Sequence, residues 1–246
     1  TLERASQSWR SFRLIMSKPK ETGLIIKENN IPFVIIMGKY DKIIRPTQAL
    51  RYAKKSGLID CVVQIECGHD FFKKENIKIT GLINNFAYTY DSNETYYEAG
   101  SAEVKKIFNV NYHGLSKIFE SLVEYSGLND DVNIRVVNVL SNSLKTYNAS
   151  NHHYISSKAA VETLATFFAK NYSEKISINN VCPGLMKSDI TSSRFSKVAK
   201  NIESLTPLKR LASPFEVAQL ISYLITESPL SICGQTIFVD GGRTLI

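Results

Sequence analysis

The chain lacks the glycine patterns that bind nucleotide phosphates. It has 12 glycines among 246 residues, and no three of them fit GxGxxG or the P-loop. Such turns bring backbone N–H groups to a phosphate at the N-terminus of a helix. A site of either kind is therefore excluded from this sequence.

Long apolar runs and paired cysteines are also absent. The apolar runs have the length of strands, well short of the roughly twenty residues that a membrane-spanning helix needs, and the N-terminus has no secretory signal pattern. The four cysteines, at positions 61, 67, 182 and 233, show neither CxxC nor zinc-finger spacing, so we expect reduced packing residues. We expect a globular cytoplasmic protein without a membrane partner.

The net charge of +7 lies mostly in residues 1–76. The basic residues are scattered and have no aromatic-basic motif beside them, so we do not expect a nucleic-acid partner. The charge is equally compatible with a nucleotide phosphate, a CoA thioester or an acyl carrier protein. It does not choose among them.

A serine, a tyrosine and a lysine form the clearest candidate site. The apolar run 134–140 is typical of a buried strand, so Ser141 should lie at its carboxyl end, where open α/β sheets bind ligands. Tyr154 begins a predicted helix, and Lys158 lies on the same face four residues later. The ammonium should favour the ionised phenol and lower its pKa, which indicates a carbonyl-reducing site.

A tyrosine and a lysine four residues apart are common on helix surfaces, so the surrounding motifs matter. An Asn-Asn-Phe-Ala turn at 84–87 follows a predicted strand, Asn111 lies in an amphipathic helix, and Pro183-Gly184 ends another strand. With the segment 234–242, their order and spacing resemble the short-chain dehydrogenase/reductase family over residues 79–246. The nearest relatives should be 3-oxoacyl-(acyl carrier protein) reductases.

The resemblance implies a doubly wound, mostly parallel, Rossmann-like α/β sheet. It implies hydride transfer between NAD(P)H and a ketone or 3-oxoacyl group, with NADP(H) favoured over NAD(H), a small-molecule or acyl-thioester substrate, and a homo-oligomer. An alternative is a non-catalytic interaction module, in which the helices beginning near residues 102 and 152 pair with a second subunit.

Roles follow from the resemblance position by position. Tyr154 would be the general acid, Ser141 would hydrogen-bond the carbonyl oxygen, and Lys158 would assist the tyrosine and hold the nicotinamide ribose. Asn111 matches an asparagine that orders a water in the proton relay. Ser143 would replace Ser141 if the turn were shifted.

The resemblance also implies a set of cofactor-binding residues. They are Asn85, Ala87, Tyr154, Lys158, Pro183, Gly184 and Ser188. Two departures stand out: Phe86 replaces a usual alanine beside the adenosine, and the family's TGxxxGxG turn is missing. We therefore predict weak or no NADPH binding. No metal is expected, and the adjacent His152 and His153 are predicted to be loop residues.

Residues 1–76 have a different signature. Predicted strands at 31–37 and 61–67 flank a helix at 47–56, and Asp41 and His69 follow the two strands. This resembles the carboxyl-terminal end of an α/β-hydrolase, although no GxSxG nucleophile elbow is present. A serine hydrolase using Asp41 and His69 is therefore an alternative. The junction near 72–80 fits a chimera, an omitted internal segment or one compact sheet built from both pieces.

Hydrophobic patterning predicts the remaining elements. A further amphipathic helix is expected at 3–17. From residue 79 onward we expect strands at 79–85, 133–140, 176–182 and 235–239, a loop at 86–100, and helices at 101–125, 152–171, 190–204 and 214–226.

Overall fold

The computed structural model describes the backbone of residues 35–38, 62–65, 80–85, 87–89, 101–128, 133–147, 152–186 and 196–246. Several predictions fall outside these residues and stay predictions: the helices at 3–17 and 47–56, the Asp41 and His69 pair, Phe86 and Ser188.

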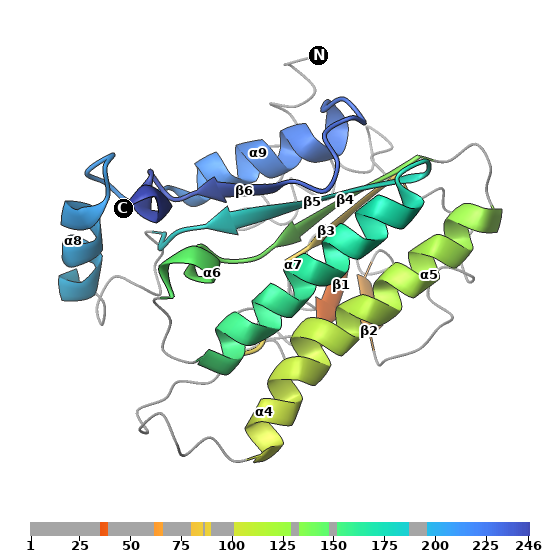
Figure 1. The fold of residues 1–246 in the computed structure, drawn as a ribbon, viewed down its shortest axis with the longest axis horizontal. Helices are drawn as coiled ribbons and strands as arrows, with labels where there is room; N and C mark the ends of the chain where they lie inside the picture. Colours follow the sequence, from red (N-terminus) through yellow and green to blue (C-terminus); the bar gives the residue numbers. More distant parts are fainter. Residues whose placement is uncertain are drawn as a thin grey trace.

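Four parallel strands form the central sheet, in the order β3-β4-β5-β6 (Figure 1). They are β3 (Gly81–Asn84), β4 (Ile134–Val139), β5 (Ile176–Pro183) and β6 (Thr236–Val239). Strand β5 is buried along its whole length, as expected for a central parallel strand with both faces covered. The four strand predictions from residue 79 onward are confirmed to within two residues at each end.

The first two strands pair only with each other. Strands β1 (Ile35–Gly38) and β2 (Val62–Ile65) are parallel and form a second sheet. Among the described strands, neither is hydrogen-bonded to the β3–β6 sheet. The three explanations for the junction near 72–80 stay open.

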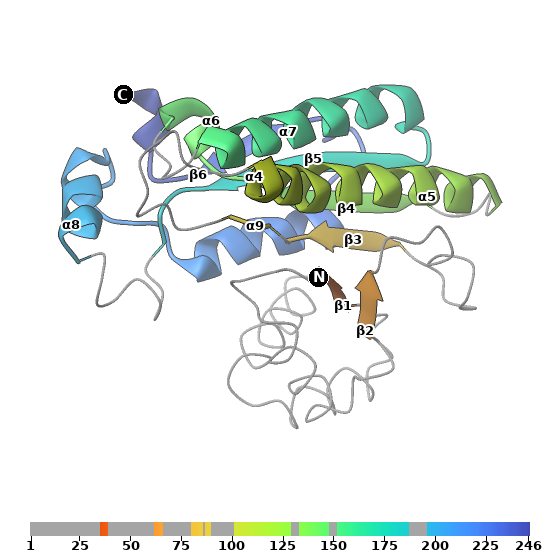
Figure 2. The same ribbon diagram turned by 90° about the horizontal axis from the view of Figure 1, so that it is seen from below.

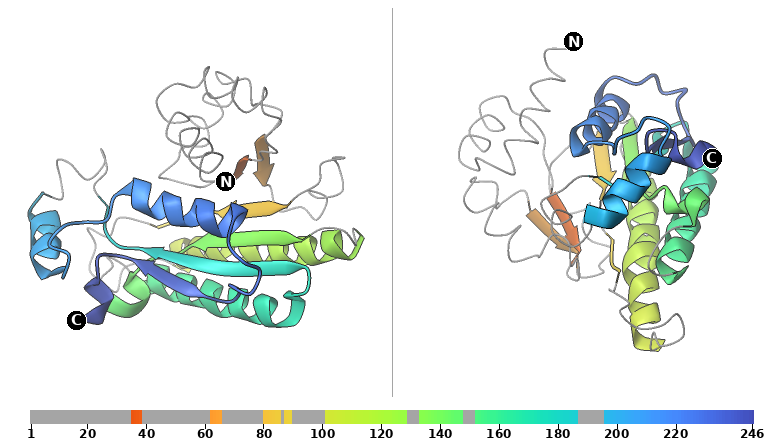
Figure 3. Two further views of the ribbon diagram at one scale, coloured as in Figure 1. Left: turned by 90° about the horizontal axis from the view of Figure 1, so that it is seen from above. Right: turned by 90° about the vertical axis from the view of Figure 1, so that its left-hand side faces the viewer.

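Helices cover both faces of the four-stranded sheet (Figures 2 and 3). One face carries α4 (Ser101–Phe108), the π-helical turn η3 (Asn109–His113), α5 (Gly114–Leu128) and α7 (His152–Tyr172). The other carries α9 (Pro214–Thr226). The short α6 (Ser143–Thr146), α8 (Ser196–Leu205) and η4 (Arg243–Leu245) complete the described elements. The predicted doubly wound arrangement is confirmed. The prediction that His152 and His153 are loop residues is wrong, because they are the first two residues of α7.

An apolar core lies on each face of the sheet, because successive side chains of a strand point to opposite faces. Val136 packs with α5 and α7 residues such as Phe119 and Val161, whereas the next residue, Val137, packs with Val217 of α9. This alternation is the ordinary consequence of the strand pleat. Within the described part of the chain, no helix is long and apolar enough to cross a membrane.

The predicted helix at 101–125 differs from the structure in one respect. It contains the π-helical turn at Asn109–His113, which splits it into α4 and α5. A uniformly amphipathic sequence gives no signal for such a turn. π-turns are frequently found at functional sites.

A ladder of amide side chains crosses the buried sheet. Asn84 donates to Asn138 at 2.8 Å, Asn138 donates to Asn180 at 2.9 Å, and Asn180 donates to Thr236 at 3.2 Å. The four residues are register partners on neighbouring strands. A slip of one residue in any pair would break the ladder and leave buried amides unsatisfied, so the ladder favours one register.

Replacing the middle of this ladder should destabilise the fold. Asn138→Ala would leave the Asn84 amide and the Asn180 carbonyl oxygen without their partner, at a cost of about 2–4 kcal/mol in the free energy of unfolding. Urea denaturation measures this cost. The exposed Asn201→Ala is the control, and equal stabilities of the two variants would contradict the ladder's importance.

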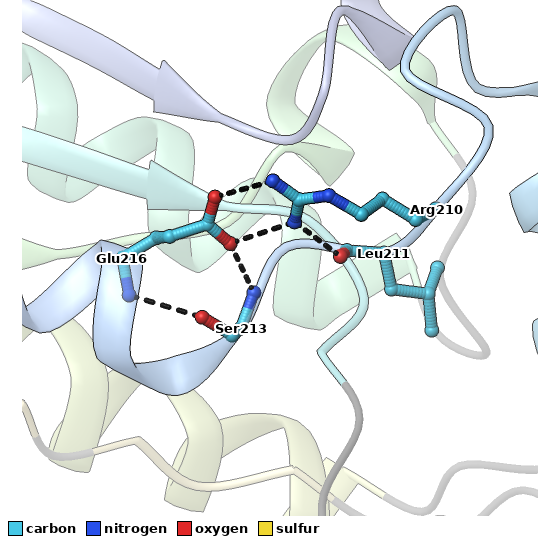
Figure 4. A network of polar contacts seen from close by, with 4 residues as sticks. All are labelled: Arg210, Leu211, Ser213 and Glu216. Carbon is cyan, nitrogen blue, oxygen red and sulfur yellow. Dashed lines mark hydrogen bonds and ion pairs between the residues drawn. The ribbon is translucent and has the colours of Figure 1, made fainter.

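The N-terminus of α9 is held by a capping box and an ion pair (Figure 4). The Ser213 hydroxyl accepts from the Glu216 N–H, and the Glu216 carboxylate accepts from the Ser213 N–H at 2.8 Å. Arg210 donates to both Glu216 oxygens, at 2.9 and 2.7 Å. These bonds, led by those from Arg210 and the Ser213 backbone, lower the pKa of Glu216 from 4.5 to about 2.

This cap should make stability depend on pH. Because the folded pKa of Glu216 is depressed, its contribution is present above pH 4.5 and is lost as the pH falls towards 2. Glu216→Gln should lower Tm at neutral pH, and the difference in Tm between variant and wild type should become smaller as the pH falls from 4.5 towards 2. Glu174→Gln, in an exposed turn, is the control for the change in net charge. A difference in Tm between Glu216→Gln and wild type that does not change with pH would contradict the role of the cap.

Candidate active site

The carboxyl ends of β4 and β5 stay paired beyond the strands. The Leu140 N–H donates to Val181 at 2.8 Å and the Asn142 N–H donates to Pro183 at 2.9 Å. Ser141 lies between these two bonds, at the sheet edge where parallel α/β folds bind ligands. Figure 1 shows α6, the start of α7 and the C-terminus of the chain at this same end of the sheet.

Lys158 reaches this edge from α7. Its ammonium donates to the carbonyl oxygen of Val139 at 2.9 Å and lies 5.8 Å from the centre of the Tyr154 ring. Only 4% of Lys158 is exposed. The predicted i, i+4 placement of tyrosine and lysine on one face of the helix is therefore present.

The phenol of Tyr154 is hydrogen-bonded to Ser141. Burial, followed by the charge of Cys182, raises the pKa of Tyr154 to about 12, and the hydrogen bond from Ser141 acts in the opposite direction. The predicted direction, a lowered pKa of the phenol, is therefore wrong for this structure. The ammonium is directed to the Val139 carbonyl, and burial of the phenol dominates.

A buried thiol on β5 lies close to the Tyr154 phenol. Cys182 is fully buried in the core, and burial followed by the charge of Glu162 raises the pKa of its thiol to about 12. A hydrogen bond from the Ser141 backbone and the charge of Lys158 act in the opposite direction. Cys182 is thus a neutral packing residue, as predicted, and Cys233 is also a free cysteine.

Asn111 connects three segments around the tyrosine. Its side chain accepts from the Tyr88 N–H at 2.7 Å and donates to the Tyr88 carbonyl at 3.0 Å and to the Ser157 hydroxyl at 2.9 Å. Ser157 in turn donates to the carbonyl of Tyr154 at 2.8 Å. Both amide hydrogens are therefore used in fixing loop 87–89 and the first turns of α7, and the predicted role in ordering a water stays a prediction.

Gly184 lies against the C-terminal turn. Its N–H donates to Val239 at 3.1 Å, and a Cβ added there would lie 2.9 Å from the Cβ of Asp240. Asp240, 6% exposed, accepts from the Asn142 amide at 3.3 Å and from the N–H groups of Gly242 and Thr244 at 3.0 Å. This carboxylate joins the serine turn, the Pro183–Gly184 turn and the end of the chain.

The donors at this edge fit part of a dinucleotide. The Lys158 ammonium and the Tyr154 phenol are suited to the hydroxyl groups of a nicotinamide riboside. Asn85 is exposed and Ala87 half-buried just after β3, and their predicted contacts with the cofactor stay predictions. No phosphate-binding glycine turn occurs in the sequence. In the described ranges, no cluster of three or more His, Cys, Asp or Glu residues could hold a metal ion.

Sequence comparisons show the family. A family model described as enoyl-(acyl carrier protein) reductase matches residues 63–244. The chain is 30% identical to 3-oxoacyl-(acyl-carrier-protein) reductase FabG of Thermotoga maritima over 169 residues, covering 68% of this chain and 67% of the relative. It is 29% identical to acetoacetyl-CoA reductase of an Acinetobacter species, covering 67% and 65%. The chain spans about two thirds of the length of these curated relatives.

Solved structures share the fold at lower identity. The alternative dihydrofolate reductase FolM of Brucella suis, solved with NADP, aligns over 93% of this chain and 90% of its own, with a TM-score of 0.71 and 21% identity. These likenesses show a Rossmann-like fold. The chain belongs to the short-chain dehydrogenase/reductase family, a family of NAD(P)-dependent enzymes.

Several contacts of the site could not be predicted from the sequence. The bonds from Asn142 to Asp240 and from Ser143 to Ser141 were missed. Asp240 lies in the predicted C-terminal motif, which was the one signal that could have drawn attention to it. The family match begins at residue 63, within the segment predicted to resemble a hydrolase, and that hydrolase prediction stays untested.

The close approach at Gly184 can be tested. Gly184→Ala would place its methyl 2.9 Å from the Cβ and 3.1 Å from the Cα of Asp240, so the turn must shift. We expect a loss of about 1–3 kcal/mol in the free energy of unfolding, measured in urea. Gly127→Ala in α5, where an added Cβ meets nothing within 4 Å, should not destabilise. Equal effects of the two substitutions would contradict this packing.

Proposed function

We propose that the protein transfers hydride between NAD(P)H and a ketone or 3-oxoacyl group, with NADP(H) as the preferred cofactor. The proposal rests on one observation: a phenol, a hydroxyl and an ammonium meet at the carboxyl end of a buried parallel sheet. Relatives named as 3-oxoacyl-(acyl-carrier-protein) and acetoacetyl-CoA reductases support the substrate class. Neighbouring structures that contain NADP or NADPH support the cofactor.

Each side chain has a distinct role in the reduction. The nicotinamide supplies the hydride to the carbonyl carbon when it is bound. Ser141 hydrogen-bonds the carbonyl oxygen as negative charge develops there, and Tyr154 gives that oxygen its phenol proton, so that the ketone becomes an alcohol. Lys158, anchored on Val139, holds a positive charge beside the phenolate that forms.

The raised pKa of Tyr154 keeps the phenol protonated. A phenol with a pKa of about 12 carries its proton at neutral pH and can give it to the substrate oxygen. The reverse reaction starts from the phenolate, so its rate should rise with pH towards that value. Reduction is the proposed direction because the relatives are named as reductases.

A homo-oligomer is part of the proposal. The relevant helices are α4 and α7, and Phe167 of α7 is 57% exposed. An exposed aromatic side chain on such a helix is compatible with a subunit contact.

Turnover of a 3-oxoacyl thioester tests the function. With excess NADPH and acetoacetyl-CoA, we expect substrate-dependent loss of NADPH absorbance. Tyr154→Phe should lower kcat by about 100-fold or more, because it removes the proton donor. Tyr223→Phe, at an exposed position of α9, should keep wild-type activity.

Two results would contradict the proposal: no oxidation of NADPH by the wild-type chain with any ketone or 3-oxoacyl thioester tried, or a Tyr154→Phe variant as active as wild type.

A separate NADPH titration tests the effect of the missing glycine turn. We expect weak binding, and low-micromolar affinity would show that other residues hold the phosphates.

A further inference from the structure

Ser143 is a buried hydroxyl, two residues beyond Ser141, that the proposed mechanism does not use. It is the first residue of α6 and is 2% exposed. Its hydroxyl donates to the Ser141 oxygen at 2.8 Å, and its N–H donates to the same oxygen at 3.2 Å. One neighbour therefore gives the Ser141 oxygen two hydrogen bonds.

These two bonds determine what Ser141 can still do. A serine hydroxyl has two acceptor positions and one hydrogen. With both acceptor positions occupied by Ser143, Ser141 acts towards other groups through its hydrogen. That hydrogen is therefore the group that Ser141 can offer to the Tyr154 phenol, with which it interacts. Consecutive hydroxyl bonds of this kind polarise and strengthen one another.

The turn that carries Ser143 is held on several sides. The Asn142 N–H donates to Pro183 at 2.9 Å, and its carbonyl accepts from the N–H groups of Lys145 and Thr146 at 3.0 Å. The Tyr147 N–H donates back to the Ser143 carbonyl at 2.9 Å. Ser143 is thus fixed relative to Ser141 by backbone contacts on both sides, and its hydroxyl keeps one geometry.

We propose that Ser143 is a positioning residue that makes Ser141 an obligate hydrogen-bond donor, whose one hydrogen goes to the Tyr154 phenol before substrate binds and to the substrate oxygen afterwards. The part concerning substrate rests on the proposed function. Sequence reasoning treated Ser143 as a substitute for Ser141, whereas the contacts connect the two hydroxyls in series. Among the described residues, the charged and titratable groups near the phenol are Lys158 of α7 and Cys182 of β5, and Glu162 and Asp240 act on Cys182.

Kinetics provides the first test. Ser143→Ala should lower kcat about tenfold with KM changed less than about twofold, a smaller loss than removing a direct oxyanion donor. In the Ser141→Ala background the same substitution should have no further effect, because Ser143 acts through Ser141. Ser143→Cys keeps the size of the side chain but donates weakly, so it should show a similar loss even if the alanine variant folds poorly.

Exposed Ser204→Ala is the control and should match wild type. Equal losses from Ser143→Ala with and without Ser141 would overturn the proposal, because they would show that Ser143 acts only on the packing of the turn. An unchanged kcat in both Ser143 variants would overturn it as well.

A second readout needs neither cofactor nor turnover. A fluorinated tyrosine, which ionises at lower pH than tyrosine, is placed at position 154 alone and titrated by its absorbance. Ser143→Ala should raise its apparent pKa by about 0.5, because the Ser141 bond no longer favours the phenolate as strongly. If the wild-type chain proves inactive but this shift is present, the proposed function fails and the role of Ser143 stands. An unchanged pKa overturns that role.

Discussion

The site depends on the pairing of β4 and β5 continuing beyond the ends of both strands. Two backbone bonds, from Leu140 to Val181 and from Asn142 to Pro183, keep the chain after β4 beside the chain after β5. Ser141 is placed by these bonds, and the Asn142 side chain adds a contact to Asp240. A shift of one residue in this register would turn Ser141 away from the phenol.

The protein specifies that register with polar groups inside an apolar sheet. The ladder from Asn84 to Thr236 runs across all four strands, behind the site, and each member has its partner only in the native alignment. Apolar side chains alone would pack almost as well in a shifted register. Buried amides would not, because each unmade bond costs free energy.

Burial also sets the chemistry of the site. The same apolar surroundings that stabilise β5 raise the pKa of Tyr154 and of Cys182 to about 12. One group then holds a proton for transfer, and the other stays an inert thiol. The hydrogen bond from Ser141 acts against this effect on Tyr154, because it favours the phenolate.

Part of this organisation could be predicted from the sequence. Strand β5 and helix α9 were predicted closely, because Ile176, Ile178, Val181 and Cys182 give β5 an apolar strand pattern, and α9 begins after Ser213 with Pro214 and has a glutamate three residues after the cap. Helical spacing also placed Tyr154 and Lys158 on one face. The direction of the tyrosine pKa was predicted wrongly, because spacing says nothing about burial or about the lysine's bond to Val139.

Contacts between distant residues were beyond reach of the sequence. Asn142 follows β4 and Asp240 follows β6, so they are far apart in the chain. They meet because β4, β5 and β6 are adjacent in the sheet. The π-turn around Asn111 and the four-residue helix α6 follow no periodic pattern long enough to be detected.

The most direct measurement of the central claim is a high-resolution crystal structure of the chain. The account predicts the Ser141 hydroxyl within hydrogen-bonding distance of the Tyr154 phenol, with the Lys158 ammonium about 3 Å from the Val139 carbonyl oxygen. Electron density in which these three side chains point apart, or in which β4 and β5 pair in another register, would contradict it.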